Sequence, residues 1–210
     1  MAIDFTFAPE VDAARIRVRE FLHETVKPAF RAMRENEDAT RKDWSALIKR
    51  LRGEAKASGN WLPHMPADVG GMGLGVTALA AVAAEAAKVP YGPYIINGHA
   101  PDEGNMHTLH HFATEFQREK YLQPLLDGEV RSCFSMTEPD VAGSDPTLIQ
   151  TTAVEQGDNW VINGHKWFAS GARGAECAIV IALALCLFSA AACGVWRGGV
   201  GGGGCGWGGG

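Results

Sequence analysis

The spacing of apolar residues changes once along this chain, near residue 129, and this change restricts the folds that are open to it. Before that point, apolar residues recur at helical spacing, as in the series Val11, Val18 and Leu22, which is typical of amphipathic helices. After it, short segments alternate between apolar and polar residues and are separated by turn residues, which favours strands. We therefore predict an α+β fold, with an all-helical domain over residues 1–128 and a partial antiparallel β-domain over residues 129–182.

Local signals mark helix ends and a loop within the first domain. Thr114, with Gln117 three residues later, predicts a capping box at the start of a helix. The glycine-rich stretch Gly70–Gly75 differs from a dinucleotide-binding fingerprint, because a helix and not a strand is expected before it. We predict a loop between two helices there.

The β-domain opens with a strand expected at Val130–Met136. This strand leads into Thr137–Pro146, a segment with too much glycine, proline, aspartate and serine to continue it. A loop of this composition offers free backbone N–H groups and small hydroxyls, which are donors that hold a phosphate or the polar edge of a ligand.

Asn163-Gly164 is the strongest hairpin signal in the chain, because both central residues of a type I′ turn need positive φ. The predicted turn returns the chain through Trp167, Phe168 and Ser170. An aromatic face beside a hydroxyl suits a flat heteroaromatic ligand, and Phe168 as ordinary hairpin core is the alternative. Further strands are expected at Thr151–Glu155, Asn159–Ile162 and His165–Ala169, with Ala178–Ala182 as an additional candidate.

Paired motifs in this region resemble the signature of the acyl-CoA dehydrogenase family. The first is Met136–Pro139 followed by Ala142–Asp145, and the second is Ile162–Lys166. Pro101–Met106 resembles the branch of the family that acts on longer or unusual acyl chains. The resemblance covers roughly residues 5–182.

The resemblance implies a flavoprotein that uses FAD to remove the α and β hydrogens of an acyl-CoA thioester. Ser144 would also contact the acyl-CoA substrate, and Phe168 falls where the family usually has a tryptophan against the flavin ring. Ser170 falls where the family has a threonine near the reactive flavin nitrogen. The resemblance further implies an electron acceptor such as an electron-transfer flavoprotein, and a homo-oligomer. The residues that it assigns to the cofactor are Phe134, Met136, Thr137, Gly143, Ser144, Phe168 and Ser170.

The catalytic base of the family is a carboxylate on a C-terminal helical bundle, beyond the part that resembles this chain. Glu138 and Asp145 belong to the loop motif, so we assign no catalytic residue and expect a truncated, inactive product. One alternative is a non-catalytic fragment that binds flavin or acyl-CoA. Another is a membrane-tethered helical module that uses residues 178–196.

The last part of the chain differs in composition from the rest. Residues 178–195 carry no charge and are long enough to span a membrane, and alanine and glycine dominate residues 183–210. A transmembrane helix and a glycine-rich functional tail both stay open. We favour a third interpretation, in which residues 183–210 are disordered and unrelated to the family, as an out-of-frame reading of GC-rich coding sequence would produce.

Charge and cysteine content bear on location and partners. The formal net charge of −5 gives no support for nucleic acid or an anionic membrane as a partner. The first residues lack the basic-then-apolar pattern of a signal peptide, so we expect a cytoplasmic protein. Five cysteines without a CxxC pair favour reduced thiols over a disulfide framework. His107, His110 and His111 share a helix, but no acidic or thiol ligand joins them nearby and we expect no metal site.

Overall fold

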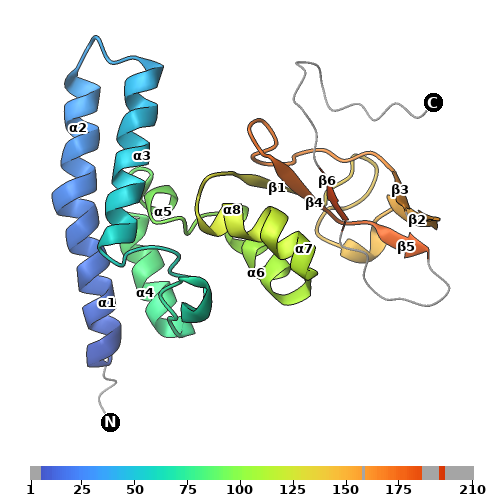
Figure 1. Ribbon diagram of the computed structural model, residues 1–210, viewed down its shortest axis with the longest axis horizontal. Coiled ribbons are helices and arrows are strands. Elements are labelled where there is room, and N and C mark those ends of the chain that lie inside the picture. The colour runs from blue at the N-terminus through green and yellow to red at the C-terminus, as the bar shows by residue number, and fades with distance from the viewer. Residues whose placement is uncertain (1–5, 158, 186–193, 197–210) are drawn as a thin grey trace. The chain divides into compact units, whose positions relative to one another are not determined.

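The computed structural model describes residues 6–157, 159–185 and 194–196. The chain forms two compact units, Met1–Glu103 and Gly104–Gly210, whose elements are labelled in Figure 1.

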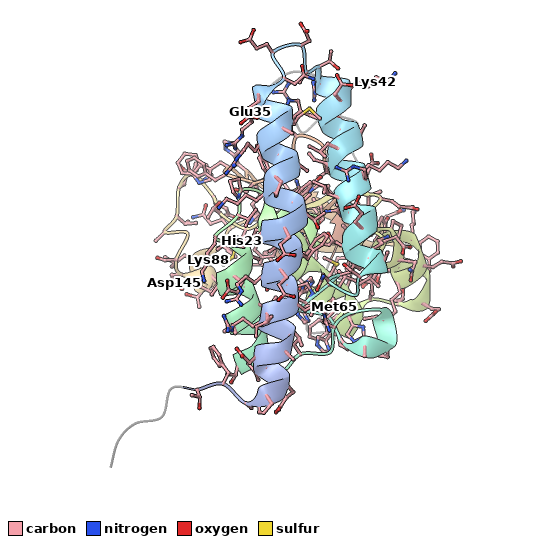
Figure 2. The ribbon with its side chains drawn as sticks, turned by 90° about the vertical axis from the view of Figure 1, so that its left-hand side faces the viewer. His23, Glu35, Lys42, Met65, Lys88 and Asp145 are labelled. Carbon is pink, nitrogen blue, oxygen red and sulfur yellow. The ribbon has the colours of Figure 1, made fainter. Side chains whose placement is uncertain are left out.

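The first unit is helical. Helices α1, η1 and α2 follow one another without a break and form one long rod, and α3 runs back beside it (Figure 1). Glu35 and Lys42 lie at the end of this helical hairpin where the chain turns (Figure 2). In chain order the elements are α1 (Pro9–Glu20), the π-helical η1 (Phe21–Val26), α2 (Lys27–Glu35), α3 (Arg41–Ala57), the 3-10 helix η2 (Ala67–Val69), α4 (Val76–Ala86) and α5 (Gly92–Ile95).

The long rod buries a single apolar stripe. The buried residues are spaced four apart, namely Ala14, Val18, Leu22, Val26 and Phe30. On a regular α-helix, with 3.6 residues per turn, each step of four residues rotates by about 40° around the axis. The wider π-helical turn of η1 in the middle of the series counteracts this drift, so the stripe continues to face the same neighbours.

A buried carboxylate links α1 to α4. Arg15 Nη1 lies 2.7 Å from Glu85 Oε1, and Lys88 Nζ lies 2.9 Å from Glu85 Oε2; Lys88 is labelled beside the rod in Figure 2. Burial acts to raise the pKa of Glu85, but hydrogen bonds from Lys88 and Arg15 bring it below its usual range. The two cations therefore compensate the removal of this charge from water.

The second unit begins within helix α6 (Asp102–Phe112) and combines helices with strands. The predicted capping box is confirmed, because Thr114 Oγ1 accepts from the Gln117 backbone N–H and the Gln117 side chain returns to the Thr114 N–H. After α6 come α7 (Glu115–Gln117), the π-helical η3 (Arg118–Leu122), α8 (Gln123–Leu126), β1 (Ser132–Ser135), the 3-10 helix η4 (Pro146–Leu148), β2 (Thr152–Gln156), β3 (Asn159–Asn163), β4 (Cys177–Val180), β5 (Leu183–Leu185) and β6 (Gly194–Trp196).

In the described part of the chain the strands form two sheets, with the orders β1-β4-β6 and β3-β2-β5. The pairs β2–β3 and β4–β6 are antiparallel, whereas β1–β4 and β2–β5 are parallel. The α+β fold class is confirmed, but the sheets are mixed and not purely antiparallel. Parallel neighbours need a crossover connection and join strands that are distant in sequence, so a local alternating pattern does not reveal them.

Asn105, within the predicted motif Pro101–Met106, anchors the first strand. Its buried side-chain amide donates to Ser132 Oγ at 2.9 Å and to the carbonyl oxygen of Cys133 at 3.1 Å. Cys133 in turn packs with Ala178 in the core of this sheet. Asn105 therefore fixes the start of β1, and the loop of the first paired motif follows the end of this strand.

The turn predicted at Asn163-Gly164 does not form, whereas the turn between the strands expected at residues 151–155 and 159–162 is confirmed. Asn163 pairs with Thr152 and so is still part of β3, and the β2–β3 turn contains Gly157, whose φ is +60°. Residues 165–169, predicted as a strand, form an irregular segment. Gly164 is a glycine for a different reason, since it allows a close approach that is described below.

The C-terminal part of the chain also differs from its prediction. Strands β5 and β6 lie beyond residue 182, where we expect only a disordered tail. Residues 186–193 and 197–210 are outside the described residues. The described residues of 178–196 include strands and no helix, so the membrane-helix alternative is wrong for them. Throughout the described ranges, no helix is long and apolar enough to cross a membrane.

The glycine-rich loop is confirmed between η2 and α4, and Gly71 is the residue in it with the least space. A Cβ placed there would lie 2.1 Å from the carbonyl oxygen of Met65. Met65 is almost fully buried, so its backbone has little room to move. In helix α3, by contrast, a Cβ on Gly53 would meet nothing within 4 Å.

We therefore expect opposite effects from two alanine substitutions. Gly71→Ala should lower the free energy of unfolding by about 1–3 kcal/mol, because the new methyl group collides with backbone atoms. Gly53→Ala should raise it by about 0.5–1 kcal/mol, because alanine is the better helix former. Urea denaturation followed by circular dichroism measures both, and equal stability of the two variants would contradict the assignment of Gly71.

Candidate functional site

Two loops of the second unit meet at the end of β1. The backbone N–H of Trp167 donates to the carbonyl oxygen of Thr137 at 3.1 Å. In return, Thr137 Oγ1 donates to the carbonyl oxygen of Trp167 at 2.8 Å. These reciprocal bonds join the two motifs that the sequence places thirty positions apart, so both motifs belong to one site.

A buried ion pair lies directly beside this junction. Lys166 Nζ donates to Glu138 Oε1 at 2.8 Å, and the two side chains are only 6% and 5% exposed. The same ammonium group donates to the carbonyl oxygen of Met136, also at 2.8 Å. Lys166 therefore contacts the loop after β1 both through a side chain and through its backbone.

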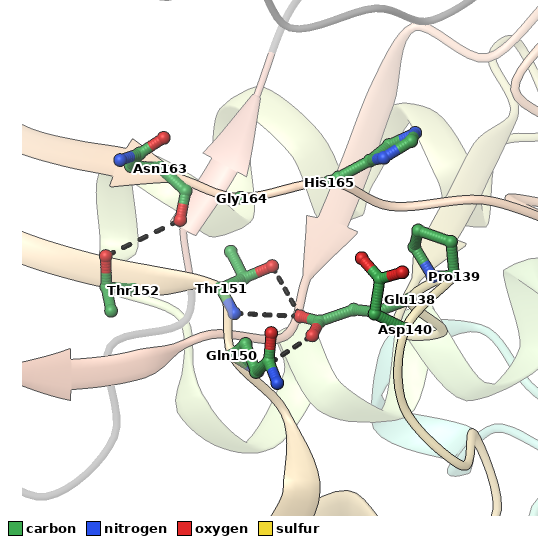
Figure 3. Close-up of a pocket in the computed structure, with 9 residues that line it drawn as sticks. All are labelled: Glu138, Pro139, Asp140, Gln150, Thr151, Thr152, Asn163, Gly164 and His165. Atoms are coloured by element: carbon green, nitrogen blue, oxygen red, sulfur yellow. Dashed lines mark hydrogen bonds between the residues drawn. The ribbon is translucent and has the colours of Figure 1, made fainter.

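Glu138 has further donors on its other side, as Figure 3 shows. Its Oε2 accepts from the backbone N–H of Gln150 at 2.7 Å. Its Oε1 accepts from the backbone N–H of Thr151 at 2.9 Å and from Thr151 Oγ1 at 2.5 Å. Burial acts to raise the pKa of Glu138, but hydrogen bonds from Lys166, Thr151 and Gln150 lower it to about 2. The carboxylate is therefore ionised throughout the physiological pH range.

Two glycines make these close contacts possible. A Cβ on Gly164 would lie 2.2 Å from Thr151 Oγ1, so a larger residue would displace the hydroxyl that bonds to Glu138. A Cβ on Gly143 would lie 2.6 Å from Thr137 Cγ2. Both motif glycines are thus explained by the space that they leave beside the loop junction.

The two aromatic residues that follow the second motif face solvent. Phe168 is 78% exposed and has a φ of +49°, an uncommon backbone conformation for a bulky side chain. Its ring lies 4.7 Å from that of Trp167, centroid to centroid, at an interplanar angle of 45°. Trp167 is itself 43% exposed. The alternative that Phe168 is hairpin core is wrong, and the ring is free to contact a ligand.

The remaining predicted site residues are distributed around this junction. Phe134 is half-buried on β1, where it pairs with Ile179, and Met136 and Thr137 are half-buried just after the strand. Ser144 and Ser170 are exposed in the two loops. The carbonyl oxygen of Met136 accepts from Lys166, and Thr137 bonds to Trp167. Gly143 lies against the side chain of Thr137.

A pocket of about 320 Å³ lies on a neighbouring surface and is drawn in Figure 3. It shares Glu138 with the ion pair, but its lining includes none of the residues predicted to bind flavin. The pocket and the predicted cofactor surface are therefore different places. The lining residues are Glu138, Pro139, Asp140, Gln150, Thr151, Thr152, Asn163, Gly164 and His165.

The ion pair is the feature that sequence reasoning missed. Glu138 and Lys166 both stand inside the paired motifs. Their presence in both halves of a paired motif is the signal that could have suggested a contact.

Around the histidines of α6, the rings of His107 and His111 stack at 6.3 Å, and no group of possible metal ligands was found among the described residues.

The lowered pKa of Glu138 predicts a specific dependence of stability on pH. The folded-state pKa of about 2 is below the ordinary glutamate pKa of 4.5, so the stabilisation is complete above about pH 5 and is lost as the pH falls through about 2. The shift corresponds to about 3 kcal/mol. Between pH 5 and pH 2, wild-type protein should lose more unfolding free energy than Glu138→Gln, by up to about this amount.

Urea denaturation at a series of pH values measures this difference. The control is Glu54→Gln, which removes the same charge from an exposed pair with Arg50 and should follow the wild-type curve closely. Parallel pH profiles for wild type and Glu138→Gln would contradict the role given to Glu138.

Comparison with known proteins agrees with this arrangement of motifs. Residues 8–129 match the family described as acyl-CoA dehydrogenase, N-terminal domain, and residues 133–191 match acyl-CoA dehydrogenase, middle domain. Acyl-CoA dehydrogenase family member 11 of Homo sapiens is 40% identical over 174 residues, which cover 80% of this chain and 22% of that protein.

Solved structures give the same result. A structure from Mycobacterium abscessus, described as an acyl-CoA dehydrogenase, is 35% identical with a TM-score of 0.76, and the match covers 86% of this chain and 47% of that one. An acyl-CoA dehydrogenase complexed with FAD, from Bacillus anthracis, is 25% identical with a TM-score of 0.59 over 85% of this chain and 30% of that one. This chain thus spans less than half the length of these proteins. The match to the N-terminal and middle domains shows that the chain belongs to the acyl-CoA dehydrogenase family.

Proposed function

We propose that the loop junction of this chain forms one side of an FAD site and serves the α,β-dehydrogenation of an acyl-CoA thioester. The observation that carries the proposal is the pairing of Thr137 with Trp167, beside which the ring of Phe168 stands 78% exposed. An exposed aromatic face beside hydroxyl groups suits the isoalloxazine ring, which stacks through its face and forms hydrogen bonds at its edge.

The residues present fit such a cofactor. Phe168 would stack on the ring system, and the hydroxyls of Thr137 and Ser170 would contact its polar edge. Gly143 leaves the surface next to Thr137 without a side chain, and Ser144 in the same loop would contact the acyl-CoA. When bound, FAD supplies the oxidation of the bond between Cα and Cβ, and the protein supplies position and electrostatics.

The comparisons support this assignment at the level of the family. The FAD complex from Bacillus anthracis matches the chain across both units. We further propose acyl-CoA as the substrate, an electron-transfer flavoprotein as the electron acceptor and a homo-oligomeric assembly, each from family membership. We also propose a cytoplasmic location. No catalytic base is assigned among the described residues, so we expect the 210-residue chain by itself to bind flavin and not to oxidise acyl-CoA.

Titration with FAD tests the proposal. A ligand that binds only the folded state raises the thermal midpoint in proportion to ln(1 + [L]/Kd), and we expect a rise with excess FAD. Phe168→Ala should reduce it through the lost stacking contact. Ser170→Ala should weaken binding about fivefold, which corresponds to one hydrogen bond of about 1 kcal/mol.

The control variant is Trp160→Ala. Trp160 is an exposed aromatic residue of β3, 42% exposed, in the same unit but outside the loop junction. It should leave the FAD response unchanged. If millimolar FAD gives no shift, or if the shift survives both site substitutions, the proposed location is wrong.

A further inference from the structure

We infer that the buried pair of Glu138 and Lys166 is a positioning device, which holds the Trp167–Phe168 segment in its exposed conformation. The inference rests on the proposed function in one respect only: the proposed function explains what the exposed conformation is for, namely contact with FAD. Neither side chain needs to touch a cofactor for this role, because both are almost fully buried.

The first support is the path of the hydrogen bonds. Lys166 Nζ bonds to Glu138 and to the carbonyl oxygen of Met136, and the next residue, Trp167, exchanges hydrogen bonds with Thr137. Three consecutive residues of one loop are therefore tied to two consecutive residues of the other. Such a run fixes the direction of the backbone as it enters Phe168.

The second support is the conformation of Phe168 itself. Its φ of +49° is unfavourable for a bulky residue, and its side chain is too exposed for burial to compensate. A sparsely populated conformation persists only where the surroundings determine it. The hydrogen-bonded residues just before Phe168, Lys166 and Trp167, hold it in this conformation.

The third support is the chemistry of the buried groups. An ion pair removed from water gains little or no net stability over an apolar pair of similar volume. What the charged pair provides is direction, since the ammonium group donates to one carboxylate and one carbonyl oxygen. The Glu138 carboxylate also orders the Gln150–Thr151 segment through three further bonds. The pair therefore fixes the geometry of the two loops in addition to any contribution that it makes to stability.

Amide hydrogen exchange on the full chain, without flavin, tests the inference. The decisive variant is Glu138→Met combined with Lys166→Met, which replaces the charges by apolar side chains. We expect some loss of stability, because the Gln150 and Thr151 donors lose their acceptor, and exchange at the Trp167 amide should accelerate at least about tenfold more than exchange at the β2–β3 amides. The β2–β3 amides report the general loss of stability, because their partners are within the hairpin.

A second variant covers the case in which the double variant does not fold. Glu138→Gln keeps the size of the side chain and removes its charge, and it should accelerate exchange at the Trp167 amide several-fold. Glu54→Gln, at an exposed charge pair, should leave this amide unchanged. The inference would be overturned if exchange at Trp167 in the folded double variant accelerates no more than exchange at the β2–β3 amides. If that variant does not fold, the same result in Glu138→Gln would overturn it.

FAD titration of the same variants separates this inference from the proposed function. If the wild-type chain responds to FAD, the double variant should bind it about tenfold more weakly at a temperature where both are folded. If the wild-type chain gives no response, the proposed function fails, and the exchange rates at Trp167 still decide whether the pair positions the loop.

Discussion

A single buried carboxylate, that of Glu138, determines the geometry of the loop junction. A charge of this kind is expensive to remove from water unless donors surround it. Here the donors come from two places in the sequence, the Gln150–Thr151 segment and Lys166. Because each donor must keep its place, the carboxylate orders loops whose glycine and serine content would otherwise leave them with many conformations.

The pocket and the loop junction are two different kinds of surface. The pocket in Figure 3 is hollow, but the Glu138 group that lines it already has its hydrogen bonds satisfied. The junction is an exposed aromatic edge and not a cavity. A site of this form covers one side of a flat ligand and leaves the other side for a further surface.

Sequence reasoning recovers the parts of this molecule that local signals determine. The change of apolar spacing separates helices from strands, the Thr114 capping box starts α7, and the paired motifs identify the family. It fails where a distant contact prevails over a local preference. Asn163-Gly164 is a strong turn signal, yet Asn163 stays in β3 opposite Thr152. The contact of Glu138 with Lys166 joins residues 28 positions apart, and no local periodicity encodes it.

The π-helical turn η1 sets the relation between the two halves of the long helical rod. Such a turn accommodates one extra residue, so straightening Phe21–Val26 into a regular α-helix with all its residues kept would rotate everything after it by about 100°. Phe30 would then leave the buried stripe that it shares with Val18 and Leu22. The conformation and the length of this segment are therefore coupled: a chain with one residue fewer keeps the stripe only if the segment becomes a regular α-helix.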